Sequence, residues 1–147
     1  MIAIASLLFA VQLDACHVLS QKDVAAVQGE TFVETKLSSH GNATTCFYQL
    51  PTFSKSISLD VMRSGAIEYW KETFDEQIEA RRARKKKDPR RVTGIGNEAL
   101  WVGGLGSGSL YVRQGDSMVR VSVGGPGSDE DKIEKSKKLA LKALKKL

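Results

Sequence analysis

The sequence lacks an apolar run long enough to span a membrane as a helix. The longest apolar run, residues 1–11, carries no charge and falls short of the roughly 20 residues that a membrane-spanning helix needs. Such a run is typical of a signal-peptide core, although the positively charged leader is missing. We expect residues 1–12 to be a truncated signal-peptide segment and residues 13–147 to form one domain, with no transmembrane span in the mature chain. The alternative is a buried first strand or helix.

The sequence also lacks a recognised catalytic or cofactor motif. The glycine-rich residues 103–108 do not have the Gly-Lys-Ser/Thr ending of a phosphate-binding loop, and they precede a strand where that motif needs a helix. Ser20, His17 and Asp23 are close in sequence, but Ser20 is already explained as a helix cap. We therefore predict no catalytic residue and no cofactor, and we expect a protein that is not an enzyme.

Cysteine and histidine are scarce, with two residues of each. An even pair of cysteines in an exported chain indicates a disulfide between Cys16 and Cys46. A competing interpretation is that Leu-Asp-Ala-Cys at residues 13–16 is close to the pattern for lipid attachment, which would exclude the disulfide. A third is two free buried thiols. A zinc site that combines the cysteines with His17 and His40 matches no usual ligand spacing, so we predict no metal site.

The length of 147 residues and the composition, 41% hydrophobic and 27% charged, are typical of one globular domain. The net charge of +5 is concentrated in residues 81–91, which hold eight basic residues and one acid. This run could bind anionic groups of an envelope surface or of nucleic acid, or it could be only a solvated helix end and loop. No aromatic residue interrupts it, which disfavours single-stranded nucleic acid because stacking platforms are absent. The candidate anion-binding residues are Arg81, Arg82, Arg84, Lys85, Lys86, Lys87, Arg90 and Arg91.

Hydrophobic periodicity predicts an α+β fold with the order helix, three strands, helix, three strands, helix. We expect an antiparallel sheet of about six strands, with a short N-terminal helix and two long helices packed on a face. Strands are predicted at residues 31–37, at 44–50, from 57 to a stop at 64–65, and at 99–102, 109–113 and 118–123, with a polar loop at 38–43. Helices are predicted from a cap at Ser20 to Gly29, from Ala66 to about Lys86, and from a cap at Ser128 to about Leu147.

The central helix is marked by Ile67, Trp70, Phe74 and Ile78, which recur at steps of three and four. This spacing places them along one face of a helix, with acidic residues outside it. Ordinary packing of an amphipathic helix explains the aromatic stripe, so we interpret it as core.

Several short motifs resemble those of a group of small exported bacterial domains. The chain has Cys-His-Val-Leu-Ser at 16–20, Asp-Val-Ala-Ala-Val-Gln-Gly at 23–29, Cys-Phe-Tyr at 46–48 and Gly-Ile-Gly-Asn-Glu-Ala at 94–99, followed by a Leu- and Ala-rich closing helix. The group has Cys-x-Leu-(Thr/Ser) with (Glu/Asp)-Val-Ala and Gly, then Cys-x-Tyr, then Gly-(Leu/Ile)-Gly-(Asp/Asn)-Glu-Ala. It includes uncharacterised lipoproteins, secreted proteins and the extracellular sensor domain of a membrane-bound kinase. The resemblance implies a paired Cys16 and Cys46, but no activity, substrate or site residue.

Together these features predict an exported cell-envelope domain, periplasmic or at the cell surface, free or lipid-anchored. We expect it to bind a ligand or partner without catalysis, such as an anionic envelope surface or another protein. The alternative is an intracellular protein that binds nucleic acid or another anionic surface through residues 81–91.

Overall fold

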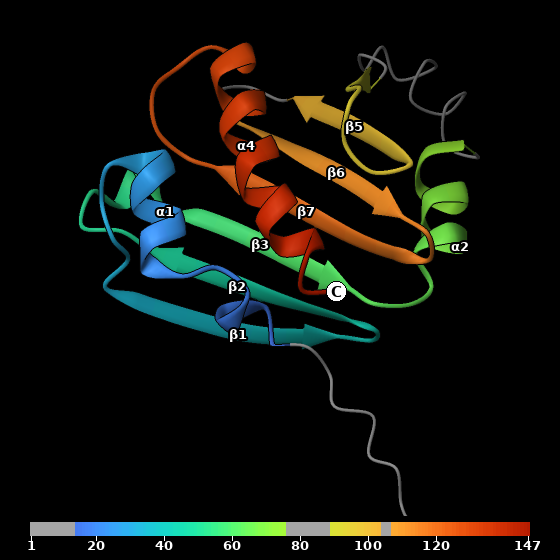
Figure 1. The fold of residues 1–147 in the computed structure, drawn as a ribbon, viewed down its shortest axis with the longest axis horizontal. Coiled ribbons are helices and arrows are strands. Elements are labelled where there is room, and N and C mark those ends of the chain that lie inside the picture. The colour runs from blue at the N-terminus through green and yellow to red at the C-terminus, as the bar shows by residue number, and fades with distance from the viewer. Residues whose placement is uncertain (1–13, 76–88, 104–106) are drawn as a thin grey trace, which may run out of the picture.

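The computed structural model describes residues 14–75, 89–103 and 107–147. Seven strands form one antiparallel sheet in the order β1-β2-β3-β7-β6-β5-β4 (Figure 1). The strands are β1 (Glu34–His40), β2 (Ala43–Gln49), β3 (Ile57–Met62), β4 (Arg90–Arg91), β5 (Glu98–Gly103), β6 (Gly108–Gln114) and β7 (Ser117–Val123). The α-helices are α1 (Gln21–Gln28), α2 (Ala66–Trp70) and α4 (Asp129–Leu144), with 3-10 turns η1 (Ala15–His17) and η2 (Phe53–Lys55) and a π-helical turn η3 (Lys71–Asp75). The predicted α+β class with antiparallel pairing is confirmed, and the strand number differs by one.

One face of the sheet carries the main core, beneath α1 and α4 (Figure 1). Every second residue of the central strands is buried there, as the alternation of the sequence predicts. The buried strand residues include Cys46, Tyr48, Ile57, Leu59, Val61, Val119, Val121 and Val123.

Both helices on this face begin with a capping box at the predicted residue. In α1 the Ser20 side chain bonds the amide of Asp23 and the Asp23 side chain bonds the amide of Ser20; Ser128 and Asp131 do the same in α4. The predicted stop of α1 at Gly29 is confirmed, since this residue has a left-handed conformation. α4 ends at Leu144, slightly earlier than predicted.

The opposite face is partly covered by α2 and η3, which lie at one end of β6 and β7 in Figure 1. Ala66, Trp70 and Phe74 are buried against Met118 of β7. We predicted that the two long helices pack on the same face of the sheet. This prediction is wrong, because α4 covers one face and the α2–η3 segment covers the other. Of the helix predicted from Ala66 to about Lys86, residues 76–86, which include Ile78, lie outside the described part.

The buried line of this helix is also shifted from the predicted one. Ile67 is 57% exposed, so its assignment to the core is wrong. The residues that face the sheet are Ala66, Trp70 and Phe74, each four positions from the next, and Ile67 lies one position off that line. The buried line begins at Ala66. Because alanine is only weakly hydrophobic, the sequence pattern favoured the neighbouring Ile67 as the buried residue.

The predicted bounds of the first strand and of the loop after it are wrong. A strand was expected at residues 31–37 and a loop at 38–43, but β1 extends through His40, and β2 begins at Ala43. All seven residues of β1 are exposed at the edge of the sheet. An edge strand without a buried face has no hydrophobic alternation to mark it, and here pairing with β2 sets its ends.

Within the described ranges, no helix combines the length and apolar character needed to cross a membrane.

Candidate functional site

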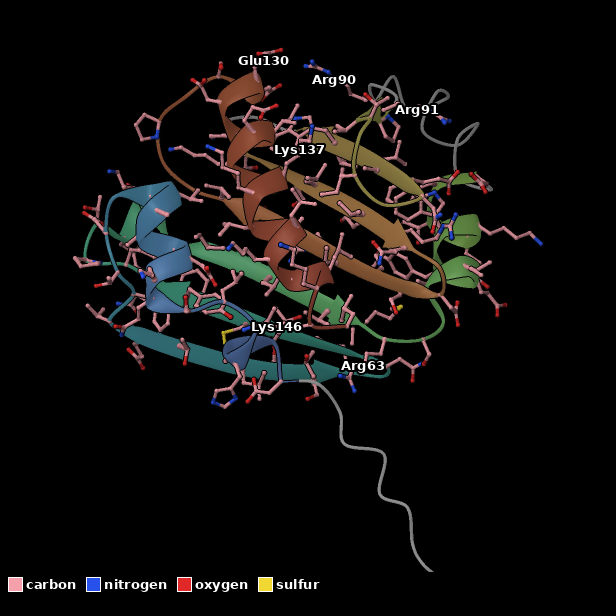
Figure 2. The ribbon with its side chains drawn as sticks, in the orientation of Figure 1. Arg63, Arg90, Arg91, Glu130, Lys137 and Lys146 are labelled. Carbon is pink, nitrogen blue, oxygen red and sulfur yellow. A yellow bond between two sulfur atoms is a disulfide. The ribbon has the colours of Figure 1, made fainter. Side chains whose placement is uncertain are left out.

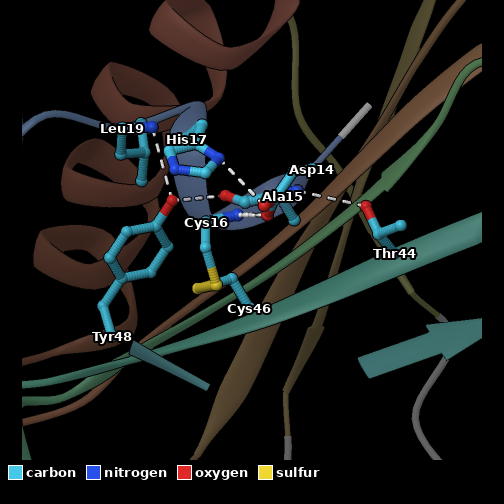
Figure 3. Close-up of a disulfide and its surroundings, with 8 residues drawn as sticks. All are labelled: Asp14, Ala15, Cys16, His17, Leu19, Thr44, Cys46 and Tyr48. Carbon is cyan, nitrogen blue, oxygen red and sulfur yellow. Dashed lines mark hydrogen bonds and ion pairs between the residues drawn. A yellow bond between two sulfur atoms is a disulfide. The ribbon is translucent and has the colours of Figure 1, made fainter. Parts of the chain in front are cut away.

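Cys16 of η1 and Cys46 of β2 form a disulfide (Figure 3). Their Cα atoms are 5.0 Å apart, and Cys46 is fully buried. The predicted pairing is present, and it occupies the sulfur that a lipid or a zinc ion would need at Cys16. A cross-link between residues 30 positions apart stabilises the fold by restricting the unfolded chain.

Tyr48 holds the same junction together by hydrogen bonds (Figure 3). Its hydroxyl donates to the carbonyl oxygen of Ala15 and accepts a bond of 3.3 Å from the amide of Leu19. The amide of Ala15 donates to Thr44 Oγ1 at 3.2 Å. Burial raises the pKa of Tyr48 to about 12, so the hydroxyl keeps its proton at neutral pH. These bonds attach the N-terminal segment to the sheet, and we assign them a structural role.

The two histidines do not form a ligand set with the cysteines, whose sulfur atoms are bonded to each other. His17 Nδ1 lies 2.9 Å from Asp14 Oδ2, and His40 Nε2 lies 3.4 Å from the hydroxyl of Ser38. Ser20 caps α1 and makes no contact with His17 that would form a nucleophile and base pair. In the parts of the chain that the structure describes, no three His, Cys, Asp or Glu residues cluster as metal ligands.

The basic segment is described only at its end, where Arg90 and Arg91 form β4. The other six candidates, Arg81, Arg82, Arg84, Lys85, Lys86 and Lys87, lie outside the described residues. Arg90 pairs with Trp101 of the main core, whereas Arg91 pairs with Leu100, which packs on the α2 side. Because paired residues share a face of the sheet, the two arginines lie on opposite faces.

The two arginines also differ in their partners (Figure 2). Arg90 Nη1 lies 2.8 Å from Glu130 Oε1 at the start of α4, and this hydrogen bond holds the pKa of Glu130 below its usual range. Both side chains are largely exposed, so this ion pair is worth little. Arg91 has no carboxylate within ion-pair distance among the described residues.

Arg91 lines a cavity of about 390 Å³ between the α2–η3 segment and residues 89–100. One wall contains Trp70 and Phe74, whose ring centroids are 4.8 Å apart, and Phe74 in turn packs edge-on against Tyr111 at 5.1 Å. The other wall is the loop from Val92 to Asn97. The volume lies in the range of small-molecule sites. A cationic side chain, aromatic rings and loop backbone thus meet in one space.

The loop that forms this wall is fixed to the neighbouring β6–β7 hairpin. The amide of Asn97 donates to the carbonyl of Arg113 at 2.8 Å, and Asn97 Oδ1 accepts a bond of 2.6 Å from the amide of Gly115. Glu98 Oε2 lies 3.3 Å from Arg113 Nε. Residues 94–100 of this stretch line the cavity.

A second polar cluster lies on the same face of the sheet, around Arg120. Its guanidinium contacts both carboxylate oxygens of Asp60, at 2.5 and 3.0 Å, and donates to Ser109 and Ser58. Partial burial works to lower the pKa of Arg120, but the bonds to Asp60 raise it overall. Asp60 and Arg120 are direct neighbours on β3 and β7. This cluster neutralises itself, and we interpret it as a cross-strand ion pair that supports the sheet.

Sequence reasoning missed the cavity because it interpreted Trp70 and Phe74 as core only. That interpretation is correct for their burial, since each is 4% exposed. The helical spacing of Trp70 and Phe74 could not predict the second wall of the cavity, because that wall is the loop from Val92 to Asn97, much later in the chain. The one available signal was Gly94-Ile95-Gly96-Asn97, a turn-forming stretch that two residues separate from the basic run.

Comparison with known proteins adds little to this description. No family model matches the chain, and no curated protein matches it. Among solved structures, it is similar to the crystal structure of a GTP binding regulator from Thermotoga maritima, with 11% sequence identity and a TM-score of 0.46 over 82% of this chain and 87% of that chain. A similarity of this size does not establish a shared function.

Proposed function

We propose that this chain is an exported cell-envelope domain that binds a small ligand or a partner and does not catalyse a reaction. The observation that carries the proposal is the disulfide between Cys16 and Cys46. Disulfides persist in oxidising compartments and are rare where glutathione and thioredoxin keep thiols reduced. The resemblance to small exported bacterial domains points the same way.

The binding part of the proposal is supported by the cavity beside Arg91. Two of its polar lining residues are already engaged with neighbouring residues. Glu98 is engaged with Arg113, and Asn97 with Gly115. A nucleophile would need a base within hydrogen-bond reach. Thr93 is the hydroxyl residue of the described lining, and no hydrogen bond joins it to a carboxylate of the described residues.

Cell fractionation combined with thiol alkylation tests the compartment. The protein expressed from its native gene should be recovered from the envelope and should resist alkylation until it is reduced. A Cys46→Ser variant is the control, because it leaves Cys16 as one reactive thiol. Recovery from the cytoplasm with two reactive thiols would contradict the proposal. Salt-dependent binding of such protein to DNA or RNA would support the intracellular alternative.

A further inference from the structure

We propose that the cavity beside Arg91 binds a small molecule that has a flat apolar body and one anionic group, such as a carboxylate, sulfonate or phosphate. The inference rests on the proposed binding function and names the class of ligand. The anionic group would meet Arg91 and the loop backbone, and the apolar body would lie along the wall that contains Trp70 and Phe74.

Arg91 is placed for this role by strand alternation. It lies on the α2 side of the sheet because it pairs with Leu100, and it lines the cavity. Its neighbour Arg90 pairs with Trp101 on the other side and is held by Glu130 at 2.8 Å. The chain thus offers two adjacent arginines of equal charge, of which one lines the cavity and the other does not.

The loop wall supplies further donors for an anion. The backbone amides of Thr93, Gly94, Ile95 and Gly96 have no hydrogen-bond partner among the residues that the structure describes. All four residues line the cavity. Unpaired backbone N–H groups beside a guanidinium favour an acceptor-rich anionic group. Because the loop is pinned at Asn97 to Arg113 and Gly115, these donors are held in place before a ligand arrives.

Two carboxylates also line the cavity, and they have different effects. Glu98 is 3.3 Å from Arg113, which compensates its charge. Asp75 has no basic partner at ion-pair distance in the described residues, and its side chain is exposed. Its negative charge opposes anion binding, so removing that charge should strengthen the complex.

Purified full-length protein can be titrated with anilinonaphthalene sulfonate, an anion with a planar naphthalene ring whose fluorescence rises in an apolar site. We expect saturable binding of one molecule per chain. Arg91→Gln should weaken it about tenfold, the usual effect of losing one charge-assisted bond. Arg90→Gln should leave the affinity nearly unchanged, and Asp75→Asn should tighten it a few-fold. The neutral analogue phenylnaphthylamine should bind more weakly than the sulfonate.

The position of the probe is tested by amide signals of nitrogen-15-labelled protein, in which residues 93–96 should shift on addition of the sulfonate. Equal losses for Arg90→Gln and Arg91→Gln, equal affinity for the neutral analogue, or no saturable binding would overturn the proposal. Shifts confined to residues around Phe53, an aromatic side chain that is 66% exposed, would also overturn it. So would an affinity that Asp75→Asn leaves unchanged or lowers. These outcomes are independent of the compartment, which fractionation and alkylation report separately.

Discussion

Gly96 occupies a position that has no room for a side chain. Its φ is +62°, and a β-carbon there would lie 2.6 Å from Val112 Cγ1 and 2.7 Å from the carbonyl oxygen of Arg113. The second contact is with backbone, so a rotamer change cannot relieve it. We predict that Gly96→Ala lowers the free energy of unfolding by about 3 kcal/mol or more, through backbone strain and steric overlap together. Urea denaturation measures this loss.

Gly94 provides the matched control, two residues earlier in the same loop. Its φ is +83°, but no atom lies within 4 Å of a β-carbon at this position. Gly94→Ala should therefore cost only the left-handed conformation, about 1 kcal/mol. Similar losses for the two variants would contradict the close approach between the loop and β6.

The N-terminus of α2 is capped by a residue from another element. Asp116, in the β6–β7 turn, accepts bonds from the amides of Gly65 at 2.9 Å and Ile67 at 3.0 Å through its carboxylate, and from Ala66 at 3.0 Å through its carbonyl oxygen. The N-cap residue, Gly65, has no side chain to make these bonds. Asp116 thus joins α2 to the hairpin that also anchors the cavity loop.

This cap gives α2 a pH-dependent stabilisation. The amides of Gly65 and Ile67 lower the pKa of Asp116 below the ordinary value of 3.8. Since the folded pKa lies below the unfolded one, the stabilisation is complete above pH values near 4 and is lost as the pH falls through the folded pKa. Asp116→Asn should therefore melt at a lower temperature than the wild type at pH 7, and this difference should shrink as the pH falls below 3.8.

Glu68→Gln separates the direct bonds from a general charge effect. Glu68 lies in the first turn of α2, where it also experiences the helix dipole, but it does not receive the bonds that Asp116 accepts. We expect a much smaller change in melting temperature for this variant. A difference between Asp116→Asn and wild type that stays constant from pH 7 to acidic pH would show that the carboxylate does not cap α2.

Elements with one buried face were predictable from the sequence, and the others were not. The strands around Leu59 and Val121 alternate because every second side chain enters the core. β1 is exposed along its whole length, so pairing defines it rather than composition. β4 has only two residues, too few for any periodicity. That short strand decides which arginine lines the cavity, so the site could not be predicted from local pattern alone.

At the scale of the whole molecule, the disulfide connects the N-terminal segment to β2, the second strand from one edge of the sheet. β2 lies between β1 and β3, and residues of η1 and the turn after it, such as Ala15 and Val18, are fully buried against the core. The cavity lies at the other end of the same sheet, beside β4 and β5. Loss of the disulfide should therefore change global stability without altering the cavity directly.

We predict that replacing both cysteines by serine lowers the free energy of unfolding by about 3–4 kcal/mol, the chain-entropy value for a loop closed by residues 30 apart. The sheet core should persist, because the pairing of β2 with β3 and of β3 with β7 does not depend on the cross-link. Urea denaturation of the wild type with and without a thiol reductant measures the same quantity, and the cysteine-free variant should not respond to the reductant. Tyr48→Phe is the companion variant, since it removes the bonds to Ala15 and Leu19 but keeps the disulfide. A cysteine-free chain as stable as the oxidised wild type would show that these hydrogen bonds and the buried side chains, and not the cross-link, hold the N-terminal segment on the sheet.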